Sequence, residues 1–315
     1  MTAAGSRGEE SPGAARVFVA VLAGPTGSGK TGLAVAVARR LGAEIVSADS
    51  QQLYRGLAVG TARPTAAEVA AVPHHLLDVA DPGEGMDAAR WVALADRAIG
   101  DIAARGRLPL VVGGTGLYLR ALLHGVVDAP GRDPALRARL EEEAARLGRP
   151  ALHRRLAEVD PQAAARIREN DLVRVIRALE MAAAGPTQSQ LFAAHRFALR
   201  RYRYRLLALD VPRPDLHRRI EVRAHAMAAL GILEEARALL ARFGPDLPKL
   251  PIGYADAAAC VSGRMSRDEL TRRIAVAHRR YARRQVIWLR KEPDVEWIRP
   301  PFDADAVAAL CRSAP

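Results

Sequence analysis

One eight-residue segment, Gly24–Thr31, restricts the possible folds of this chain more than any other feature of its sequence. It reads GPTGSGKT and fits the pattern G-x-x-x-x-G-K-[ST], whose glycines let backbone N–H groups turn inward around phosphate oxygens. Such a loop lies between a strand and a helix, because the helix N-terminus adds partial positive charge to the phosphate site. Val17–Ala23 before it is apolar and β-rich, and the alanine-rich segment after it closes at Gly42, as a helix does. The sequence therefore predicts a strand, a phosphate-binding loop and a helix in succession.

Individual residues of this loop have separate predicted roles. We expect the ammonium of Lys30 to lie on the terminal phosphate and the hydroxyl of Thr31 to ligate Mg²⁺. Lys30 is one of only three lysines in a chain where almost every cation is arginine, which indicates a need for a compact point charge. A chance glycine-rich turn is the alternative, but the flanking strand and helix argue against it. The predicted diphosphate-binding residues are Gly24, Pro25, Thr26, Gly27, Ser28, Gly29, Lys30 and Thr31.

A second acidic residue, which P-loop kinases and ATPases use to order Mg²⁺, is missing from its usual place. The buried strand Leu108–Val112 runs into a Gly-Gly-Thr turn without an acid. The strand Glu44–Ala48 ends instead at Asp49, whose carboxylate can order a metal, take a proton from an incoming nucleophile, or merely cap a helix. The loop therefore predicts a di- or triphosphate ligand without establishing ATP hydrolysis.

The remaining patterns predict an α/β fold. Asp87–Arg105 has apolar residues at helical spacing, and Arg205–Val211 returns to strand character. Long helices follow over Asp215–Phe243, interrupted by a glycine, and over Ser266–Leu289, and Val295–Ile298 is a candidate edge strand. This alternation indicates a P-loop NTPase-like parallel sheet that is flanked by helices on both faces.

A purely helical pattern interrupts the alternation. Three residue pairs are helix-start signals, each with an N-cap residue ahead of a helical run: Asp133-Pro134, Asp160-Pro161 and Asn170-Asp171. Because no strand pattern occurs in this stretch, we expect an inserted all-helical domain at residues 131–203. The catalytic core would then consist of residues 16–130 and 204–315.

The distribution of charge indicates a polyanionic partner. The net charge is +12 and the pI is near 10.6. From Arg132 to Arg205 there are sixteen arginines against nine acidic residues, and from Arg272 to Lys291 there are eight basic residues and no acid. Part of the second segment forms one basic helical face suited to RNA phosphates, with ordinary solvated surface as the alternative. This face consists of Arg279, Arg280, Arg283 and Arg284.

Other features exclude several classes of protein. No apolar run reaches the ~18–20 residues that span a bilayer, so no membrane association is predicted. Residues 1–15 are small and polar, without a hydrophobic stretch of signal-peptide type, and we interpret them as a disordered tail on a cytoplasmic protein. Cys260 and Cys311 lie far apart without ligand-like neighbours, which predicts neither a disulfide framework nor a zinc site.

Six segments, taken together and in this order, resemble the motifs of the tRNA dimethylallyltransferase family, also called isopentenylpyrophosphate transferases. The resemblance extends from Val17 to about Arg290. It is closest to bacterial members, because the Cys/His zinc module of eukaryotic relatives is missing. The six segments are GPTGSGKT (24–31), SADSQQLYRGLAVGTARPT (47–65), PHHLLD (73–78), VVGGTGLYLRALLHG (111–125), NDLVRVIRALE (170–180) and HRRYARRQVIWLR (278–290).

The resemblance implies a reaction. The loop would hold the pyrophosphate of dimethylallyl diphosphate, with Mg²⁺ and without ATP, while N6 of adenosine 37 beside the tRNA anticodon attacks the allylic carbon. Asp49 matches the family's general base, which accepts the proton of this amine and contributes ~10²–10⁴-fold to the rate. Thr115 matches a threonine that positions the base and the diphosphate, and Arg223 matches an arginine that contacts the diphosphate.

The resemblance also implies that the chain binds the anticodon stem-loop of tRNA and draws the target base out of its stack. We expect it to do so as a monomer. Val173 departs from the family pattern, in which a Gln is frequent at this position. The residues that match tRNA contacts are Ser50, Gln51, Gln52, Arg137, Val173, Arg174 and Arg177, to which the basic face adds Arg279, Arg280, Arg283 and Arg284.

Three other functions stay open on the sequence. An enzyme that prenylates free adenine nucleotides would share the loop and Asp49 but would not need the concentrated positive charge. A P-loop kinase would transfer phosphate from ATP, against which the missing acid argues. An RNA-binding protein with a vestigial loop would use the basic segments alone.

Overall fold

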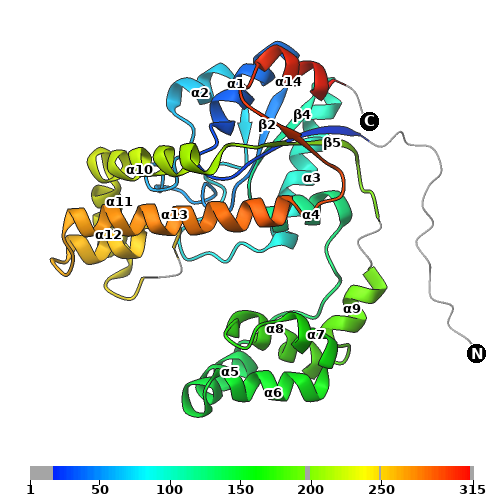
Figure 1. Ribbon diagram of the computed structural model, residues 1–315, viewed down its shortest axis with the longest axis vertical. Coiled ribbons are helices and arrows are strands. Elements are labelled where there is room, and N and C mark those ends of the chain that lie inside the picture. The colour runs from blue at the N-terminus through cyan, green and yellow to red at the C-terminus, as the bar shows by residue number, and fades with distance from the viewer. Residues whose placement is uncertain (1–16, 196–198, 248–249, 313–315) are drawn as a thin grey trace, which may run out of the picture. The chain divides into compact units, whose positions relative to one another are not determined.

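A six-stranded parallel sheet forms the centre of the computed structural model, which describes residues 17–195, 199–247 and 250–312 (Figure 1). The strand order is β3-β2-β4-β1-β5-β6, and each neighbouring pair is parallel. The predicted tail at residues 1–15 lies outside the described residues. The strands are β1 (Phe18–Ala23), β2 (Glu44–Ala48), β3 (His74–His75), β4 (Pro109–Gly113), β5 (Arg203–Leu209) and β6 (Val295–Ile298).

Helices cover both faces of this sheet, because residues that point to either side of the inner strands are apolar. Val19 and Val21 of β1 pack against α3 (Ala88–Ala104) and α4 (Gly116–His124). Their neighbours Ala20 and Leu22 pack on the opposite face against α1 (Lys30–Leu41) and α14 (Ala304–Cys311). The predicted α/β fold with a parallel sheet is therefore confirmed.

A second helical layer is formed by α10 (Arg213–Leu230), α11 (Ile232–Phe243), α12 (Tyr254–Val261) and α13 (Arg267–Leu289). These helices share one core, in which Leu57 from the loop after β2 also packs. The predicted interruption between α10 and α11 lies at Gly231, whose φ of 127° ends the first helix. Ser266 caps α13 by accepting a hydrogen bond from the N–H of Glu269 at 3.2 Å.

The elements that sequence patterns did not predict are short. β3 has two residues and exists because His74 pairs with Ile45 of β2, a contact between distant parts of the chain. α2 (Ala66–Ala71) has a capping box but no buried residue that would produce a helical pattern. Helices α4, α12 and α14 have eight or nine residues each, too few for a clear period. No helix in the described ranges is both long and apolar enough to cross a membrane.

Residues 124–200 form a separate compact unit, which we call the helical unit. Its three predicted N-caps are confirmed, since Asp133, Asp160 and Asp171 each accept a backbone hydrogen bond at the start of a helix. The unit begins before the expected residue 131, and it ends before 203 because Arg203 pairs with Phe18 in the sheet. Its helices are α5 (Pro134–Leu147), α6 (Arg149–Val159), α7 (Pro161–Arg166), α8 (Leu172–Ala183) and α9 (Gln188–His195).

One buried carboxylate organises the helical unit. The side chain of Glu180 in α8 is fully buried and accepts two hydrogen bonds from Arg137 of α5, at 2.8 and 2.9 Å. Arg177 lies 3.5 Å from the same carboxylate and also donates to the carbonyl of Pro130 at 2.7 Å. The contact with Pro130 holds the segment before α5 on the helical unit, which explains why the unit begins early.

We expect Glu180→Ala to destabilise the helical unit by about 2–4 kcal/mol, because the change leaves two arginines without their shared acceptor. Hydrogen exchange of the α8 amides measures this loss as faster local opening. Glu142→Ala provides the control, since Glu142 is exposed on α5. Equal protection of α8 in the two variants would contradict the role of Glu180.

Candidate functional site

The loop Gly24–Thr31 joins β1 to α1 and borders a cavity of about 240 Å³ at the carboxyl end of the sheet. Gly27 and Gly29 have φ angles of 83° and 86°, left-handed values that favour glycine. A Cβ on Gly27 would lie 2.9 Å from Cγ1 of Ile220, so α10 packs directly on the loop. The loop residues that line the cavity are Thr26, Gly27, Gly29, Lys30 and Thr31. The other cavity residues are Gly32, Asp49, Gln52, Thr61, Ala62, Arg63, Glu68 and Arg223.

Three of the predicted loop residues, Gly24, Pro25 and Ser28, do not line the cavity. The N–H of Gly24 donates to the carbonyl of Gly113 at 3.2 Å, and the carbonyl of Pro25 accepts from the N–H of Ser28 at the same distance. The side chain of Ser28 is buried, and its Oγ has no partner among the described residues. Gly24 and Pro25 make backbone hydrogen bonds that hold the loop in place, and the other five residues line the cavity.

Gln285 of α13 ties the loop to the turn after β4. Its side-chain Oε1 accepts from the N–H of Thr26 at 2.8 Å, and its Nε2 donates to the carbonyl of Gly114 at 3.0 Å. A Cβ on Gly114 would lie 2.2 Å from that Nε2, so the turn needs glycine for this close approach. Gln285 was not identified from the sequence, where it stands as one polar residue within an arginine-rich helix.

Two cations face the cavity without a counter-ion. Arg223 of α10 donates from Nη1 to Oγ1 of Thr26 at 3.2 Å, which places it against the loop as the resemblance implied. Neither Lys30 nor Arg223 forms an ion pair within the described part of the chain. Burial lowers the pKa of both groups, and Asp49 opposes this shift in each case. An anion in the cavity would therefore relieve an existing electrostatic cost.

Asp49 lies at the end of β2 and borders the same cavity. Its residue is 8% exposed, and Oδ1 accepts from the N–H of Gln51 at 2.9 Å. The carboxylate therefore orders a local turn and does not cap a helix. Oδ2 has no hydrogen-bond partner in the described ranges, so it is available to accept a proton.

Three hydroxyl groups meet beside Asp49. Oγ1 of Thr115 accepts from the N–H of Ser50 at 2.9 Å and lies 3.2 Å from Oγ of the same serine. The hydroxyl of Tyr281 in α13 lies 3.4 Å from Thr115 Oγ1. Burial, reinforced by the charge of Asp49, raises the pKa of Tyr281 to about 12, so this hydroxyl stays protonated. The structure thus brings Thr115, Ser50 and Asp49 together and adds Tyr281, which sequence reasoning missed.

The two glutamines after Ser50 are engaged by the fold itself. Oε1 of Gln51 accepts from the N–H of Ile252 at 2.8 Å. Nε2 of Gln52 donates to the carbonyl of Ala62 at 3.0 Å, and Gln52 borders the cavity. Their predicted contact with adenosine stays a prediction.

The basic residues of α13 divide into two groups. Arg280, Arg283 and Arg284 are exposed, whereas Arg279 is half-buried and lies 3.9 Å from Glu221 of α10. The guanidinium of Arg284 lies over the ring of Tyr281, 5.6 Å from its centroid. One helix therefore carries exposed arginines and a residue of the hydroxyl cluster.

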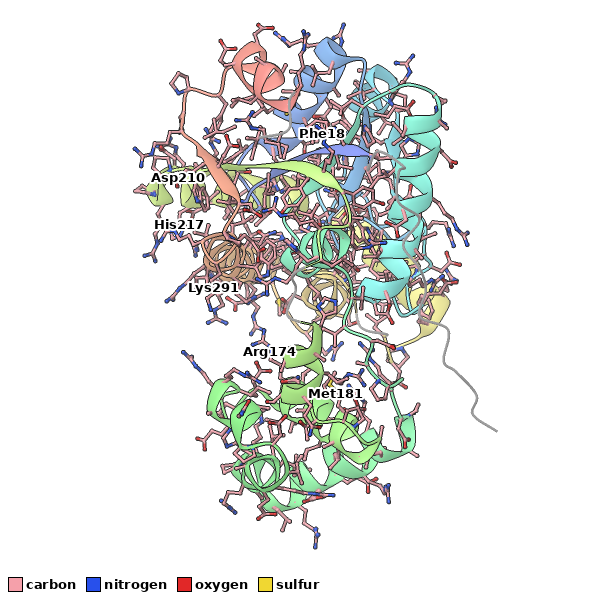
Figure 2. The ribbon with its side chains drawn as sticks, turned by 90° about the vertical axis from the view of Figure 1, so that its right-hand side faces the viewer. Phe18, Arg174, Met181, Asp210, His217 and Lys291 are labelled. Atoms are coloured by element: carbon pink, nitrogen blue, oxygen red, sulfur yellow. The ribbon has the colours of Figure 1, made fainter. Side chains whose placement is uncertain are left out.

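In the helical unit the predicted tRNA contacts also separate. Val173 and Arg174 are exposed in the first turn of α8, where Figure 2 labels Arg174. Arg137 and Arg177 are instead bound to buried Glu180, so their visible role is to hold the helices together. Spacing along the sequence could not reveal this, because Glu180 is distant in sequence from Arg137 and stands in a helix whose other buried residues are apolar.

Comparisons with known proteins converge on one family. The family model described as IPP transferase matches residues 52–292. A tRNA dimethylallyltransferase from Anaeromyxobacter sp. (strain Fw109-5) is 73% identical over 91% of this chain and 96% of its own length. One from Myxococcus xanthus (strain DK1622) is 52% identical over 96% of this chain and 98% of its own.

Solved structures give the same result. The tRNA isopentenylpyrophosphate transferase of Bacillus halodurans has a TM-score of 0.67 and 36% identity, covering 94% of this chain and 97% of its own. A eukaryotic dimethylallyltransferase that was captured acting on tRNA has a TM-score of 0.74 and 26% identity, over 90% of this chain and 74% of its own.

We expect Gln285→Ala to weaken the binding of inorganic pyrophosphate, because the Thr26 N–H and the Gly114 carbonyl lose their shared partner. Titration calorimetry should show a reduction of ~5–20-fold, equivalent to about 1–2 kcal/mol. Ile287→Ala on the exposed side of α13 is the control. Unchanged affinity in Gln285→Ala would remove the residue from its positioning role.

His278 predicts a pH dependence of stability. It is buried in α13, and burial together with the nearby charge of Arg223 lowers its pKa to about 4. The unfolded chain binds this proton below pH ~6.5, so stability should fall as the pH drops from there toward 4, by up to about 3 kcal/mol. We expect His278→Gln to remove this component, which urea unfolding at pH 7 and pH 4.5 measures. Parallel pH curves for the two proteins would contradict the assignment.

Proposed function

Because this chain belongs to the IPP transferase family, we propose that it transfers the dimethylallyl group of dimethylallyl diphosphate to N6 of adenosine 37 in tRNA. The products are N6-isopentenyladenosine in the tRNA and diphosphate. The observation that carries the proposal is one cavity in which Lys30 and Arg223 lack counter-ions and Asp49 keeps an oxygen free. Together these groups suit an anionic leaving group and a nucleophile that must lose a proton.

The loop would bind the diphosphate before and during its departure. Backbone N–H groups of the loop and the N-terminus of α1 favour an anion at this position. As the C1–O bond breaks, the bonding electrons pass to a diphosphate oxygen, and Lys30 and Arg223 stabilise the growing charge. Neither cation forms an ion pair with a carboxylate among the described residues, which supports this role, since such a pair would compete with the ligand.

Asp49 would act as the general base. The N6 amine of adenine is a weak nucleophile, so its attack on C1 is assisted when a carboxylate takes the proton as the N–C bond forms. Thr115 and Ser50 would hold this part of the site in place through the hydroxyl cluster that includes Tyr281. The base would enter the pocket after it has been drawn out of the anticodon loop.

Mg²⁺ fits the residues present. Thr31 carries the hydroxyl that a phosphate-binding loop supplies to this ion, and both it and Asp49 border the cavity. The described residues contain no group of three acidic, histidine or cysteine side chains, which accords with an ion held largely by water and substrate phosphates. When bound, Mg²⁺ would neutralise charge on the diphosphate.

Exposed arginines would bind the tRNA backbone. Arg280, Arg283 and Arg284 on α13, together with Arg174 on α8, are the exposed members of the predicted contacts. Phosphate contacts of this kind make affinity fall with salt. The resulting enzyme would work on tRNA in the cytoplasm, as a monomer.

A direct assay tests the function. Radiolabelled dimethylallyl diphosphate is offered with tRNA and AMP side by side, and label in tRNA digests is assigned to N6-isopentenyladenosine by mass spectrometry. We expect label in tRNA and none in AMP. Labelling of AMP alone would establish the prenylation of free nucleotides instead, and phosphate transfer from γ-labelled ATP would indicate a kinase.

Asp49→Ala is expected to lower turnover by at least ~10² while pyrophosphate binding persists, because the base is lost and the phosphate contacts stay. Lys30→Ala should abolish prenyl transfer through the loss of diphosphate binding, with tRNA affinity largely retained. Single-turnover rates, pyrophosphate titration and tRNA filter binding separate the two effects. Wild-type turnover in Asp49→Ala would remove this residue from the role of base.

A further inference from the structure

We propose that Arg63 is a third cationic contact for the diphosphate, acting together with Lys30 and Arg223. The inference rests on the function proposed above, because it assigns a further residue to the same site. Arg63 lies in the Ser47–Thr65 segment, whose resemblance to the family assigned it no role. Its place in the cavity and its incomplete pairing suggest one.

Arg63 borders the same cavity of about 240 Å³ as the two other cations. It comes from the loop after β2, whereas Lys30 begins α1 and Arg223 belongs to α10. The three cations therefore reach the cavity from three separate elements. A diphosphate bound at the loop would be bordered by positive charge from all three.

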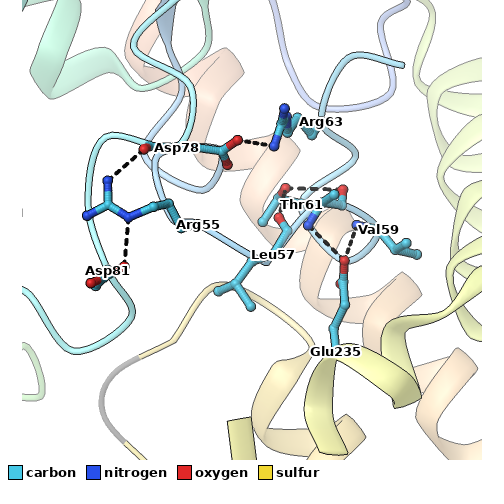
Figure 3. Close-up of polar contacts among 9 residues, drawn as sticks. Arg55, Leu57, Val59, Thr61, Arg63, Asp78, Asp81 and Glu235 are labelled. Carbon is cyan, nitrogen blue, oxygen red and sulfur yellow. Dashed lines mark hydrogen bonds and ion pairs between the residues drawn. The ribbon is translucent and has the colours of Figure 1, made fainter. Parts of the chain in front are cut away.

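The guanidinium of Arg63 is only partly engaged. Its Nη1 forms an ion pair with Oδ2 of Asp78, as Figure 3 shows. Nε and Nη2 have no hydrogen-bond partner among the described residues, and neither has the buried Oδ1 of Asp78. The contact is therefore single, not the two-pronged pair that arginine and carboxylate often form. The free N–H groups retain the planar fork that matches two phosphate oxygens.

The backbone on both sides of the pair is strained. Ala62 has a φ of 50° and Asp78 a φ of 52°, left-handed values that residues other than glycine seldom adopt. Such strain persists where surrounding contacts impose it, and it concentrates at ligand sites. Here it sets the direction of both partners beside the cavity.

Glu235 of α11 fixes the segment that carries Arg63 (Figure 3). Its carboxylate accepts hydrogen bonds from the N–H groups of Ala58, Val59 and Gly60 and from the hydroxyl of Tyr254, at 2.8, 2.8, 3.2 and 2.6 Å. Thr61 adds a hydrogen bond from its hydroxyl to the carbonyl of Leu57 at 2.6 Å. Because this backbone is fixed before a ligand arrives, ligand binding at Arg63 costs little backbone entropy in this segment.

The assigned role follows the charge of the reaction. The C1–O bond breaks, its electron pair stays on the diphosphate, the N6–C1 bond forms, and Asp49 takes the N6 proton. Negative charge on the leaving group rises during this step. Arg63 donates hydrogen bonds to that charge and neither gains nor loses a proton, since a guanidinium stays protonated.

The chain contains a matched control for Arg63. Arg55, in the same loop, pairs with Asp81 at 2.7 Å through Nε and donates to the Asp78 carbonyl at 2.9 Å, as Figure 3 also shows. Arg55 does not border the phosphate cavity. The two arginines therefore share residue type, segment and kind of partner, and they differ in access to the ligand.

The first test measures the affinity of the full chain for inorganic pyrophosphate by titration calorimetry with Mg²⁺. We expect Arg63→Ala to bind ~10–100-fold more weakly, as the loss of a charge-assisted contact predicts. Arg63→Lys keeps the charge but loses the fork, so its affinity should lie between the two. Arg55→Ala should stay within ~2-fold of the unchanged protein.

Equal affinity in Arg63→Ala and the unchanged protein would overturn the proposal. A matching loss in Arg55→Ala would also overturn it, because the effect would then come from the loop as a whole. If Arg63→Ala fails to fold, the pyrophosphate affinities of Arg63→Lys and Arg63→Gln are compared with that of Arg55→Ala instead, and affinities equal to that of the unchanged protein would overturn the proposal.

Asp78→Asn separates ligand contact from a structural role of the pair. Asparagine tolerates the left-handed φ, and its neutral amide no longer competes for the guanidinium. We expect equal or tighter pyrophosphate binding, whereas a purely structural pair predicts the same loss as Arg63→Ala. Pyrophosphate binding requires neither tRNA nor prenyl transfer, so it tests the role of Arg63 independently. A protein that binds pyrophosphate through Arg63 but does not prenylate tRNA would refute the proposed function and leave the role of Arg63 intact.

Discussion

Two cations, Lys30 and Arg223, face one cavity and form no ion pair among the described residues, and the packing around the cavity has to hold them there. Lys30 and Arg223 are drawn together by the loop and by α10, and burial lowers the pKa of each. Keeping two cations close together costs free energy, which the surrounding contacts must offset. The inner strands supply this rigidity, because both of their faces are packed under helices. A site of this kind gains stability when an anion enters, as the proposed diphosphate would do.

Helix α13 carries exposed arginines as well as residues that contact the candidate site. Arg280, Arg283 and Arg284 are exposed, while Tyr281 and Gln285 of the same helix contact Thr115 and the phosphate-binding loop. The helix spans 23 residues, and its inner face is ordered by packing against α10 and α12. RNA phosphates bound on the outer side would therefore contact the same rigid element that holds the loop in position.

Local physics made much of the fold predictable. The strand-loop-helix unit follows from glycine and lysine spacing, the caps at Asp133 and Asp160 follow from side chains that accept backbone N–H groups, and β2 and β6 follow from short apolar runs. Local patterns also placed Asp49 at the end of a strand, but its role as general base was implied by the family resemblance, and the structure places it at the edge of the cavity. The family resemblance also named Arg137 and Arg177 as tRNA contacts, but it gave no sign that both share the buried carboxylate of Glu180.

The glycine-rich loop, the alternating core and the helical insertion were predictable from sequence patterns, since each depends on residues that are close together in the chain. Only the folded structure shows that Nε and Nη2 of Arg63 have no hydrogen-bond partner among the described residues. It also decided that Gln285 holds the loop from 259 residues away and that Glu235 anchors the segment bearing Arg63. These roles depend on contacts between single side chains that are distant in the sequence. A periodic pattern describes one helix or strand at a time, so it cannot predict such contacts.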